Sequence, residues 1–191
     1  MSDVARLRAE VAACRVCAGA LPLGPRPVLQ IGGGARLLIT SQAPGTKAHA
    51  SGIPWTDASG DRLRDWLGMR AEDFYDPDKL AIVPMGFCYP GAVKGGGDLP
   101  PRPECAPLWH ARLLQAMPGV KLRLLIGIHA QAAYLPARLP MTEAVRRARD
   151  FLPIFPLPHP SWRVVGWMRR NPWFEEETLP LLRAEVARAL G

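Results

Sequence analysis

The fold of this chain is decided by the stretch Arg36-Leu37-Leu38-Ile39-Thr40, which runs directly into Ser41-Gln42-Ala43-Pro44-Gly45. A compact apolar run that ends in turn-forming residues is typical of a strand buried on both faces, as in a parallel sheet. Three further runs of this kind follow, at Ala81–Met85, Leu122–Gly127 and Phe151–Leu157. The sequence therefore predicts four buried strands.

Helical patterns separate these strands and flank them. They lie at residues 3–13, Ser59–Leu67, Leu108–Met117, His129–Tyr134, Thr142–Arg149 and Trp173–Leu190. Strands that alternate with helices predict an α/β fold, with a mainly parallel four-stranded sheet and helices on both faces. The chain has 191 residues and no internal repeat. We expect residues 1–191 to form a single three-layer α/β/α domain.

The charge of the chain is compatible with a polyanionic partner. There are 24 basic and 17 acidic residues, and the net charge is +7. This excess is typical of proteins that bind nucleic acids. Only four of the basic residues are lysines, so a protein with an arginine-rich surface and no such partner is the alternative. No apolar run reaches membrane-spanning length, and we expect no membrane partner.

The four cysteines predict a metal centre. Cys14 and Cys17 form a Cys-x-x-Cys pair, and Cys88 and Cys105 follow far along the chain. The N-terminal residues Met1–Leu21 carry several charges and lack the apolar region of a signal peptide, which indicates a cytoplasmic protein with reduced thiols. Four thiolates suit either an iron–sulfur cluster or zinc. Two disulfides, or four unrelated buried thiols, are the alternatives.

Candidate functional residues follow the strands, because ligands of open α/β sheets bind at the carboxyl ends of the strands. Gln42 follows the first strand, and His159 follows the last in a loop stiffened by two prolines. Trp55 lies in a nearby turn, where its flat ring is a candidate platform for a base. The glycine runs at residues 32–34 and 95–97 lack the context of a nucleotide-binding loop, so we expect them to be flexible loops.

The order and spacing of these motifs resemble those of the uracil-DNA glycosylase superfamily, most closely its iron–sulfur branch, typified by thermophile enzymes. The cysteine pairs are similar to the four cysteines of that branch. Ser41–Gly45, Gly52–Trp55 and Gly60 resemble the first family motif, and His159-Pro160-Ser161 matches the second. The resemblance covers nearly the whole chain.

This resemblance implies hydrolysis of the N-glycosidic bond of uracil, or of another deaminated or modified base, after the nucleotide has flipped out of DNA. His159 would donate a hydrogen bond to the oxygen of the leaving base, and Gln42 would share the catalytic role. Ala43, Pro44 and Gly45 would hold the base, and Trp55 would stack on it. A structural 4Fe–4S cluster on the cysteines, or alternatively zinc, is implied, in a cytoplasmic, nucleoid-associated monomer.

The stretch after His159 is the expected DNA contact. It interleaves tryptophans with arginines, and in relatives the loop after the histidine motif enters the minor groove. The residues expected to contact DNA are Ser161, Trp162, Arg163, Arg169 and Arg170. A wedge formed by Trp162 or Trp167 is one interpretation, and tryptophans that anchor the last helix are the other.

Two departures from the family pattern bear on activity. Pro84 stands where the iron–sulfur branch has an asparagine that reads the uracil edge, and Gln42 replaces a glutamate. The aspartate of the most efficient glycosylases would align with Ala43, which leaves Asp57 or Asp61 to take its place. The sequence thus leaves three functions open: a DNA glycosylase, a non-catalytic nucleic-acid-binding protein, or an enzyme acting on a free nucleoside.

Overall fold

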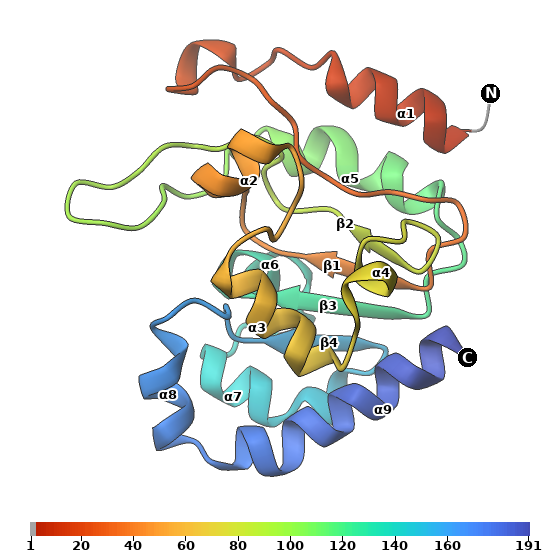
Figure 1. Ribbon diagram of the computed structural model, residues 1–191, viewed down its shortest axis with the longest axis vertical. Coiled ribbons are helices and arrows are strands. Elements are labelled where there is room, and N and C mark those ends of the chain that lie inside the picture. Colours follow the sequence, from red (N-terminus) through yellow and green to blue (C-terminus); the bar gives the residue numbers. More distant parts are fainter. Residues whose placement is uncertain (1–2) are drawn as a thin grey trace.

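Four parallel strands form the centre of the molecule, in the order β2-β1-β3-β4 (Figure 1). The computed structural model describes residues 3–191. The strands are β1 (Leu37–Thr40), β2 (Leu80–Ile82), β3 (Leu122–Ile126) and β4 (Ile154–Leu157). In the register of the sheet, Ile39 lies opposite Ile82 on one side and Leu124 on the other. The predicted parallel four-stranded sheet is confirmed.

Helices surround this sheet. In chain order they are α1 (Asp3–Ala12), η1 (Ala18–Ala20), α2 (Thr46–Ser51), α3 (Ala58–Leu67), α4 (Ala71–Phe74), α5 (Cys105–Gln115), α6 (Ile128–Tyr134), α7 (Met141–Arg146), η2 (Ala148–Phe151), α8 (Val164–Arg170), η3 (Phe174–Thr178) and α9 (Leu179–Leu190). No helix within the described part of the chain is long and apolar enough to cross a lipid bilayer.

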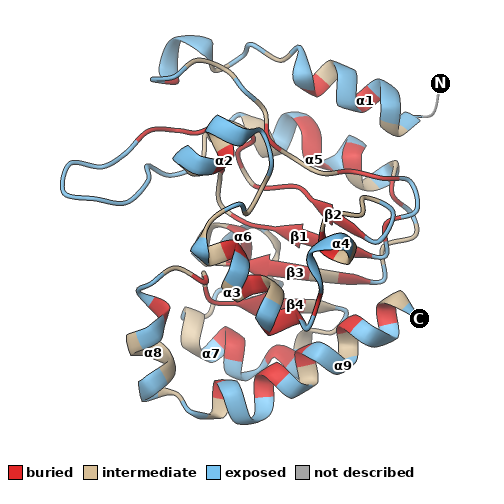
Figure 2. Ribbon diagram, in the orientation of Figure 1, coloured by how far each residue is buried: buried red, intermediate tan, exposed pale blue. Residues whose placement is uncertain are grey.

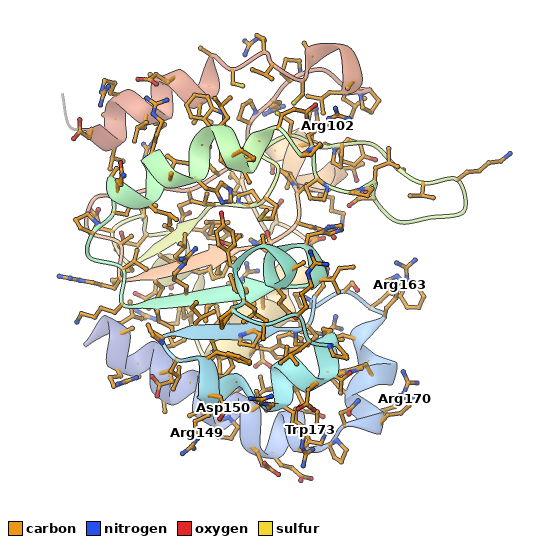
Figure 3. All side chains as sticks on the ribbon, turned by 180° about the vertical axis from the view of Figure 1, so that it is seen from behind. Arg102, Arg149, Asp150, Arg163, Arg170 and Trp173 are labelled. Atoms are coloured by element: carbon orange, nitrogen blue, oxygen red, sulfur yellow. The ribbon has the colours of Figure 1, made fainter. Side chains whose placement is uncertain are left out.

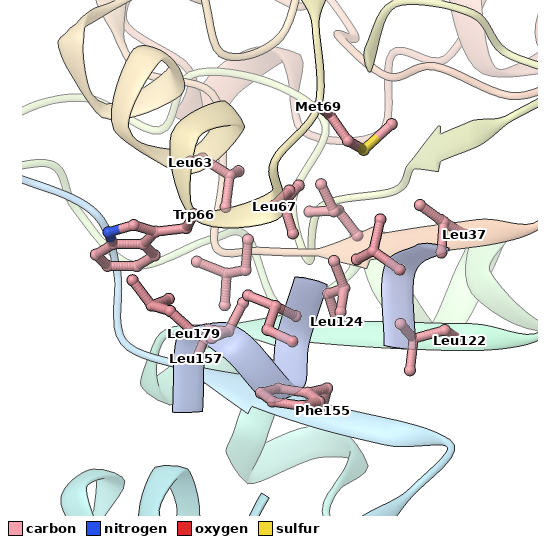
Figure 4. Packing of buried hydrophobic residues seen from close by; sticks show 14 of the residues in the cluster. Leu37, Leu63, Trp66, Leu67, Met69, Leu122, Leu124, Phe155, Leu157 and Leu179 are labelled. Atoms are coloured by element: carbon pink, nitrogen blue, oxygen red, sulfur yellow. The ribbon is translucent and has the colours of Figure 1, made fainter. Parts of the chain in front are cut away.

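Successive side chains of β1 point to opposite faces of the sheet, and they contribute to two hydrophobic layers. Leu37 and Ile39 pack with α3, α7 and α9 on one face of the sheet (Figure 4). Leu38 points to the other face, where α1 and α5 cover it. All four residues of β1 are buried, as Figure 2 shows for the sheet as a whole. The predicted three-layer α/β/α fold is therefore confirmed.

The limits of all four strands differ from the prediction, by one residue for β1 and β3 and by more for β2 and β4. Strand β2 ends at Ile82 rather than Met85, although the N–H groups of Val83 and Met85 still donate hydrogen bonds to the carbonyls of Ile39 and Ser41. Strand β4 begins at Ile154 rather than Phe151, since the residues before it form the 3₁₀ helix η2. Apolar residues in a helical turn and in a strand look alike in a short run, which explains the second error.

The helices also differ from the prediction in places. Helix α5 begins at Cys105 rather than Leu108, because a proline is tolerated in the first turn of a helix. The C-terminal helix starts as the π-helical turn η3 and continues as α9. The short helices α2, α4 and α8 were not predicted. They are too short to show a clear amphipathic period.

The loop formed by residues 91–100 extends away from the body of the protein, beside α2 (Figure 1). Residues 92–100 are exposed, and Figure 2 shows this in pale blue. An isolated antiparallel bridge between Ala92 and Asp98 closes the loop. Its tip, Gly95–Gly97, has positive φ angles of 99–105°, which glycine adopts without strain. The glycine run is a loop, as predicted, and the bridge places Asp98 at its base.

Candidate active site

One cavity of about 420 Å³ opens at the carboxyl ends of the strands. Its walls are formed by residues 41–48 and 54–59, together with Val28, Arg62, Ile82, Pro84, Asp98, His159 and Trp162. Gln42, Trp55 and His159 come from three separate segments and all line this cavity. The structure thus brings together the three side chains on which the sequence-based interpretation depends.

Gln42 follows β1 and presents its side chain to the cavity. The backbone carbonyl of Gln42 accepts a hydrogen bond of 2.9 Å from the N–H of Gly86, and that of Ser41 accepts one of 2.8 Å from Met85. These bonds fix the segment against the chain that leaves β2. The Gln42 side-chain amide has no hydrogen-bond partner among residues 3–191. It is therefore free to bind a ligand, and Ala43, Pro44 and Gly45 extend the same wall.

Trp55 is held in place by its backbone. Its φ angle of 60° is unusual for a residue with a side chain. Its carbonyl accepts hydrogen bonds from the Tyr75 hydroxyl at 3.0 Å and from Arg64 Nη1 at 3.3 Å. Gly60 lies so close that a Cβ there would be 1.9 Å from this carbonyl oxygen. Strained backbone that the surroundings enforce is common at functional sites.

The ring of His159 lies beside that of Trp55 in the wall of the cavity. The centroids of the two rings are 5.5 Å apart, and the planes are tilted by 32°. The imidazole has no hydrogen-bond partner in the described part of the chain. Gly127, which follows β3, lies beside it, where a Cβ would be 3.6 Å from the Cβ of His159. Burial lowers the pKa of His159, and the negative charge of Asp57 partly opposes this. The histidine is therefore a neutral, unpartnered hydrogen-bonding group at neutral pH.

Two carboxylates line the cavity. Asp57 caps the N-terminus of α3, where its Oδ1 accepts a 3.0 Å hydrogen bond from the N–H of Gly60. Asp98 arrives from the projecting loop, and burial together with the charge of Asp57 raises its pKa. Asp61, the other candidate acid, forms an ion pair with Arg64 and does not line the cavity. Of the two candidate acids, Asp57 lines the cavity and Asp61 does not.

Asp98 could not be recognised from the sequence as a site residue. It lies in a glycine-rich loop that carries no motif, and only the bridge to Ala92 turns it towards the cavity. Lys47 and Arg62 also line the cavity. Arg62 Nη1 donates a 2.7 Å hydrogen bond to the carbonyl of Pro160, which ties α3 to the histidine loop.

Pro84 presents neither a polar side chain nor its carbonyl to the cavity. That carbonyl accepts a hydrogen bond of 2.9 Å from Nε2 of His110, which is buried. A carbonyl can only accept, so Nδ1 of His110 accepts from the Tyr134 hydroxyl at 2.5 Å. Burial lowers the pKa of His110 and keeps it neutral. With Val28 and Ile82, Pro84 makes this part of the cavity apolar.

The expected DNA-contacting residues lie beside the cavity mouth and along α8. Trp162 is 75% exposed and lines the cavity, and the Arg163 guanidinium lies 5.3 Å from its ring. Arg169 and Arg170 are exposed in the last turn of α8, and Figure 3 shows Arg163 and Arg170 extending outward. Trp167 instead donates a 2.8 Å hydrogen bond to Thr142. Of the two tryptophans, only Trp162 is free to contact a ligand.

The four cysteines line a second, small pocket away from the cavity. All four are free thiols, so the structure does not contain the two disulfides considered as an alternative. Burial raises the pKa of Cys105 to about 12, and Cys105 Sγ accepts a hydrogen bond from the N–H of Phe87 at 3.4 Å. Among residues 3–191, no three His, Cys, Asp or Glu side chains are grouped so as to hold a metal ion. The metal centre stays a prediction.

The family comparison agrees with the geometry of the cavity. A family model described as the uracil DNA glycosylase superfamily matches residues 30–183. This range includes Gln42, Trp55 and His159, and it leaves out Cys14 and Cys17. It does not distinguish the branches of the superfamily, so the iron–sulfur branch also stays a prediction. Because the match covers most of the chain, this protein belongs to the uracil DNA glycosylase superfamily.

Proposed function

We propose that this protein is a DNA glycosylase that removes uracil, or another deaminated or modified base, from DNA. The observation that carries the proposal is the convergence of His159, Asp57 and Gln42 on one cavity in a chain of this superfamily. A volume of about 420 Å³ lies within the range of small-molecule sites and accommodates a flipped nucleobase. A base inside a duplex cannot reach such a cavity, so the nucleotide must flip out of the stack.

The chemistry that we propose uses two groups with opposite roles. The bond between C1′ of deoxyribose and the ring nitrogen breaks, and the base leaves with the bonding electrons. Neutral His159 donates a hydrogen bond to the base oxygen on which negative charge develops. The Asp57 carboxylate stabilises the positive charge at the sugar and orients the water that adds to C1′. The departing base gains one proton, the sugar gains a hydroxyl, and no cofactor is consumed.

The choice of base rests on the wall around Pro84. With its carbonyl bound by His110, Pro84 offers no hydrogen bond to the base edge, so the Gln42 amide is the side chain that we assign to base recognition. A site that leaves one edge of the base unread discriminates less between similar bases. We therefore propose that the protein accepts several deaminated or modified bases, with Trp55 and residues 43–45 holding the ring.

The proposal is tested on oligonucleotides that carry uracil, hypoxanthine or xanthine, in single- and double-stranded form. We expect abasic product from at least one of them, detected by alkaline cleavage on a denaturing gel. No product from any substrate would reject the glycosylase function. Specific DNA affinity without product would instead support the second candidate function, that of a DNA-binding protein without catalysis. This candidate is suggested by Gln42 and Pro84, which replace a glutamate and an asparagine of the family.

We assign DNA contact to the half-buried Ser161 and to four exposed residues, Trp162, Arg163, Arg169 and Arg170. Three arginines and an exposed indole suit a phosphate backbone and an unstacked base. Binding through phosphates weakens as salt increases, which separates this function from that of an enzyme acting on free nucleosides. We propose that the protein acts as a monomer on nucleoid DNA in the cytoplasm.

We further propose that Cys14, Cys17, Cys88 and Cys105 hold a 4Fe–4S cluster, with zinc as the alternative. All four thiols line one small pocket, and four thiolates are the donor set that such a cluster needs. No three of them are grouped closely enough to hold a metal ion among residues 3–191, so binding would draw them together. The cluster would be a structural cross-link between the N-terminal segment, the chain after β2 and the start of α5. Hydrolysis of a glycosidic bond needs no electron transfer, so the catalytic steps proceed without it.

Anaerobically purified protein is expected to show a broad visible absorbance that the Cys88→Ser variant loses. Because metal binding stabilises the folded state, we expect this variant to unfold at a lower temperature than the wild-type protein. The checks are an absorbance spectrum, a metal analysis and a thermal melt. A colourless protein that contains zinc would replace the cluster by zinc, and a protein with neither metal would refute the centre.

A further inference from the structure

Lys47 is the only lysine that lines the cavity. The chain has three others. Lys79 is bound to Asp73 at 2.5 Å, Lys94 lies in the projecting loop, and Lys121 precedes β3 at the opposite end of the sheet. Lys47 is exposed and yet contributes to the cavity wall, so it lies at the rim. A flipped base occupies the interior of the cavity, and the rim is therefore where its sugar lies.

The Lys47 amine is free to react. No ion pair or hydrogen bond of its side chain occurs within the range 3–191. Amines of this kind attack carbonyl carbons to form Schiff bases. The sugar left behind by base excision opens to an aldehyde at C1′, which is such a carbonyl. A glycosylase product with an aldehyde would thus meet an unpaired amine at the same rim.

A carboxylate lies close to the chain segment that carries this amine. A Cβ at Gly45, two residues before Lys47, would lie 3.5 Å from Oδ2 of Asp98, so this carboxylate reaches the segment that carries the lysine. Burial and the charge of Asp57 raise the pKa of Asp98. A carboxylate with a raised pKa is a stronger base than one with the ordinary pKa. An amine and a base at one rim are what an elimination at the abasic sugar requires.

We propose that the same cavity cleaves the DNA strand at abasic sites. Nζ of Lys47 first loses a proton to water. The neutral amine then adds to C1′ of the open sugar, and loss of water gives an imine. The Asp98 carboxylate takes a proton from C2′, the C–H electrons form a C2′=C3′ double bond, and the 3′ phosphate leaves with the C3′–O electrons. Water then hydrolyses the imine and releases Lys47. The steps need no oxidant or reductant. The inference rests on the proposed function for the origin of the abasic site and for the position of its sugar at the rim of the cavity.

The test uses an oligonucleotide in which the abasic site is already present, so it does not depend on base excision by this protein. Sodium borohydride reduces the imine to a stable amine and thereby traps protein on DNA. We expect the wild-type protein and the control Lys121→Ala to be trapped, with the adduct located at Lys47 by peptide mass spectrometry. The Lys47→Arg variant, which keeps the charge, is expected to lose at least about 90% of the adduct.

The Asp98→Asn variant separates the two steps. We expect it to be trapped as the wild-type protein is, but to cleave the strand at least about tenfold more slowly without borohydride, because the C2′ proton has lost its acceptor. Absence of an adduct with wild-type protein, or an adduct that persists in Lys47→Arg, would overturn the proposal. Since DNA affinity of each variant is measured in parallel, a loss of binding is not mistaken for a loss of chemistry.

Discussion

Replacing His159 with alanine is expected to lower the rate of base excision by about 100- to 1,000-fold, with little change in DNA affinity. The imidazole is the neutral, unpartnered donor of the cavity, and its ring lies 5.5 Å from that of Trp55. A donor aimed at a developing oxyanion stabilises the transition state more than the bound substrate. The effect should therefore appear in kcat, measured by single-turnover excision on the best substrate from the panel.

The control for this variant is His159→Asn, which keeps a hydrogen-bond donor and should retain more activity than His159→Ala. A pH titration gives an independent check of the neutral state. Burial lowers the pKa of His159, so its NMR titration midpoint should lie below the usual value of about 6.5. The imidazole then stays neutral at pH 7 and gains its proton only in more acidic solution. Excision that is unchanged in both variants would remove His159 from the mechanism.

Changing Asp57 to asparagine is expected to lower kcat by about 100-fold or more, while the fold stays intact. Asparagine caps helices as well as aspartate does, so the hydrogen bond from Gly60 is kept and the carboxylate charge alone is lost. Without that charge the positive sugar and the attacking water lose their partner. The measurement is again single-turnover excision, with a thermal melt to show that the stability is preserved.

Asp61→Asn is the matched control for Asp57→Asn. Asp61 lies on the same helix, pairs with Arg64 and does not line the cavity, so its variant should excise bases at the wild-type rate. A second measurement follows from the coupling between the two groups. The charge of Asp57 raises the pKa of His159, so Asp57→Asn should move the His159 midpoint to lower pH. Equal rates for the two aspartate variants would show that Asp57 is not the group that acts on the sugar.

The fold could be predicted because its strands are apolar runs that helices separate. Leu37–Thr40 is buried in full, as a central strand of a parallel sheet must be. The limits of elements were harder to predict. A strand that stops before Pro84 and a 3₁₀ turn before Ile154 depend on backbone hydrogen bonds that an apolar pattern does not encode.

The site could be predicted only where a motif marks it. Gln42, Trp55 and His159 lie in motifs at strand ends or turns, and they do share a cavity. Asp98 reaches the cavity through a loop bridge with no sequence signature. The bond between His110 and the Pro84 carbonyl joins residues 26 positions apart. Such contacts arise from packing between helices and the sheet, and one sequence does not reveal them.

The fit of Gly60 under Trp55 has a mechanical consequence. Leu63 and Trp66 anchor α3 in the hydrophobic core. Gly60, in the first turn of this helix, packs directly against the Trp55 carbonyl. That side of the cavity is therefore as rigid as the protein interior, which is packed as densely as an organic crystal. The cavity is therefore preformed, and the nucleic acid rather than the protein must change its conformation on binding.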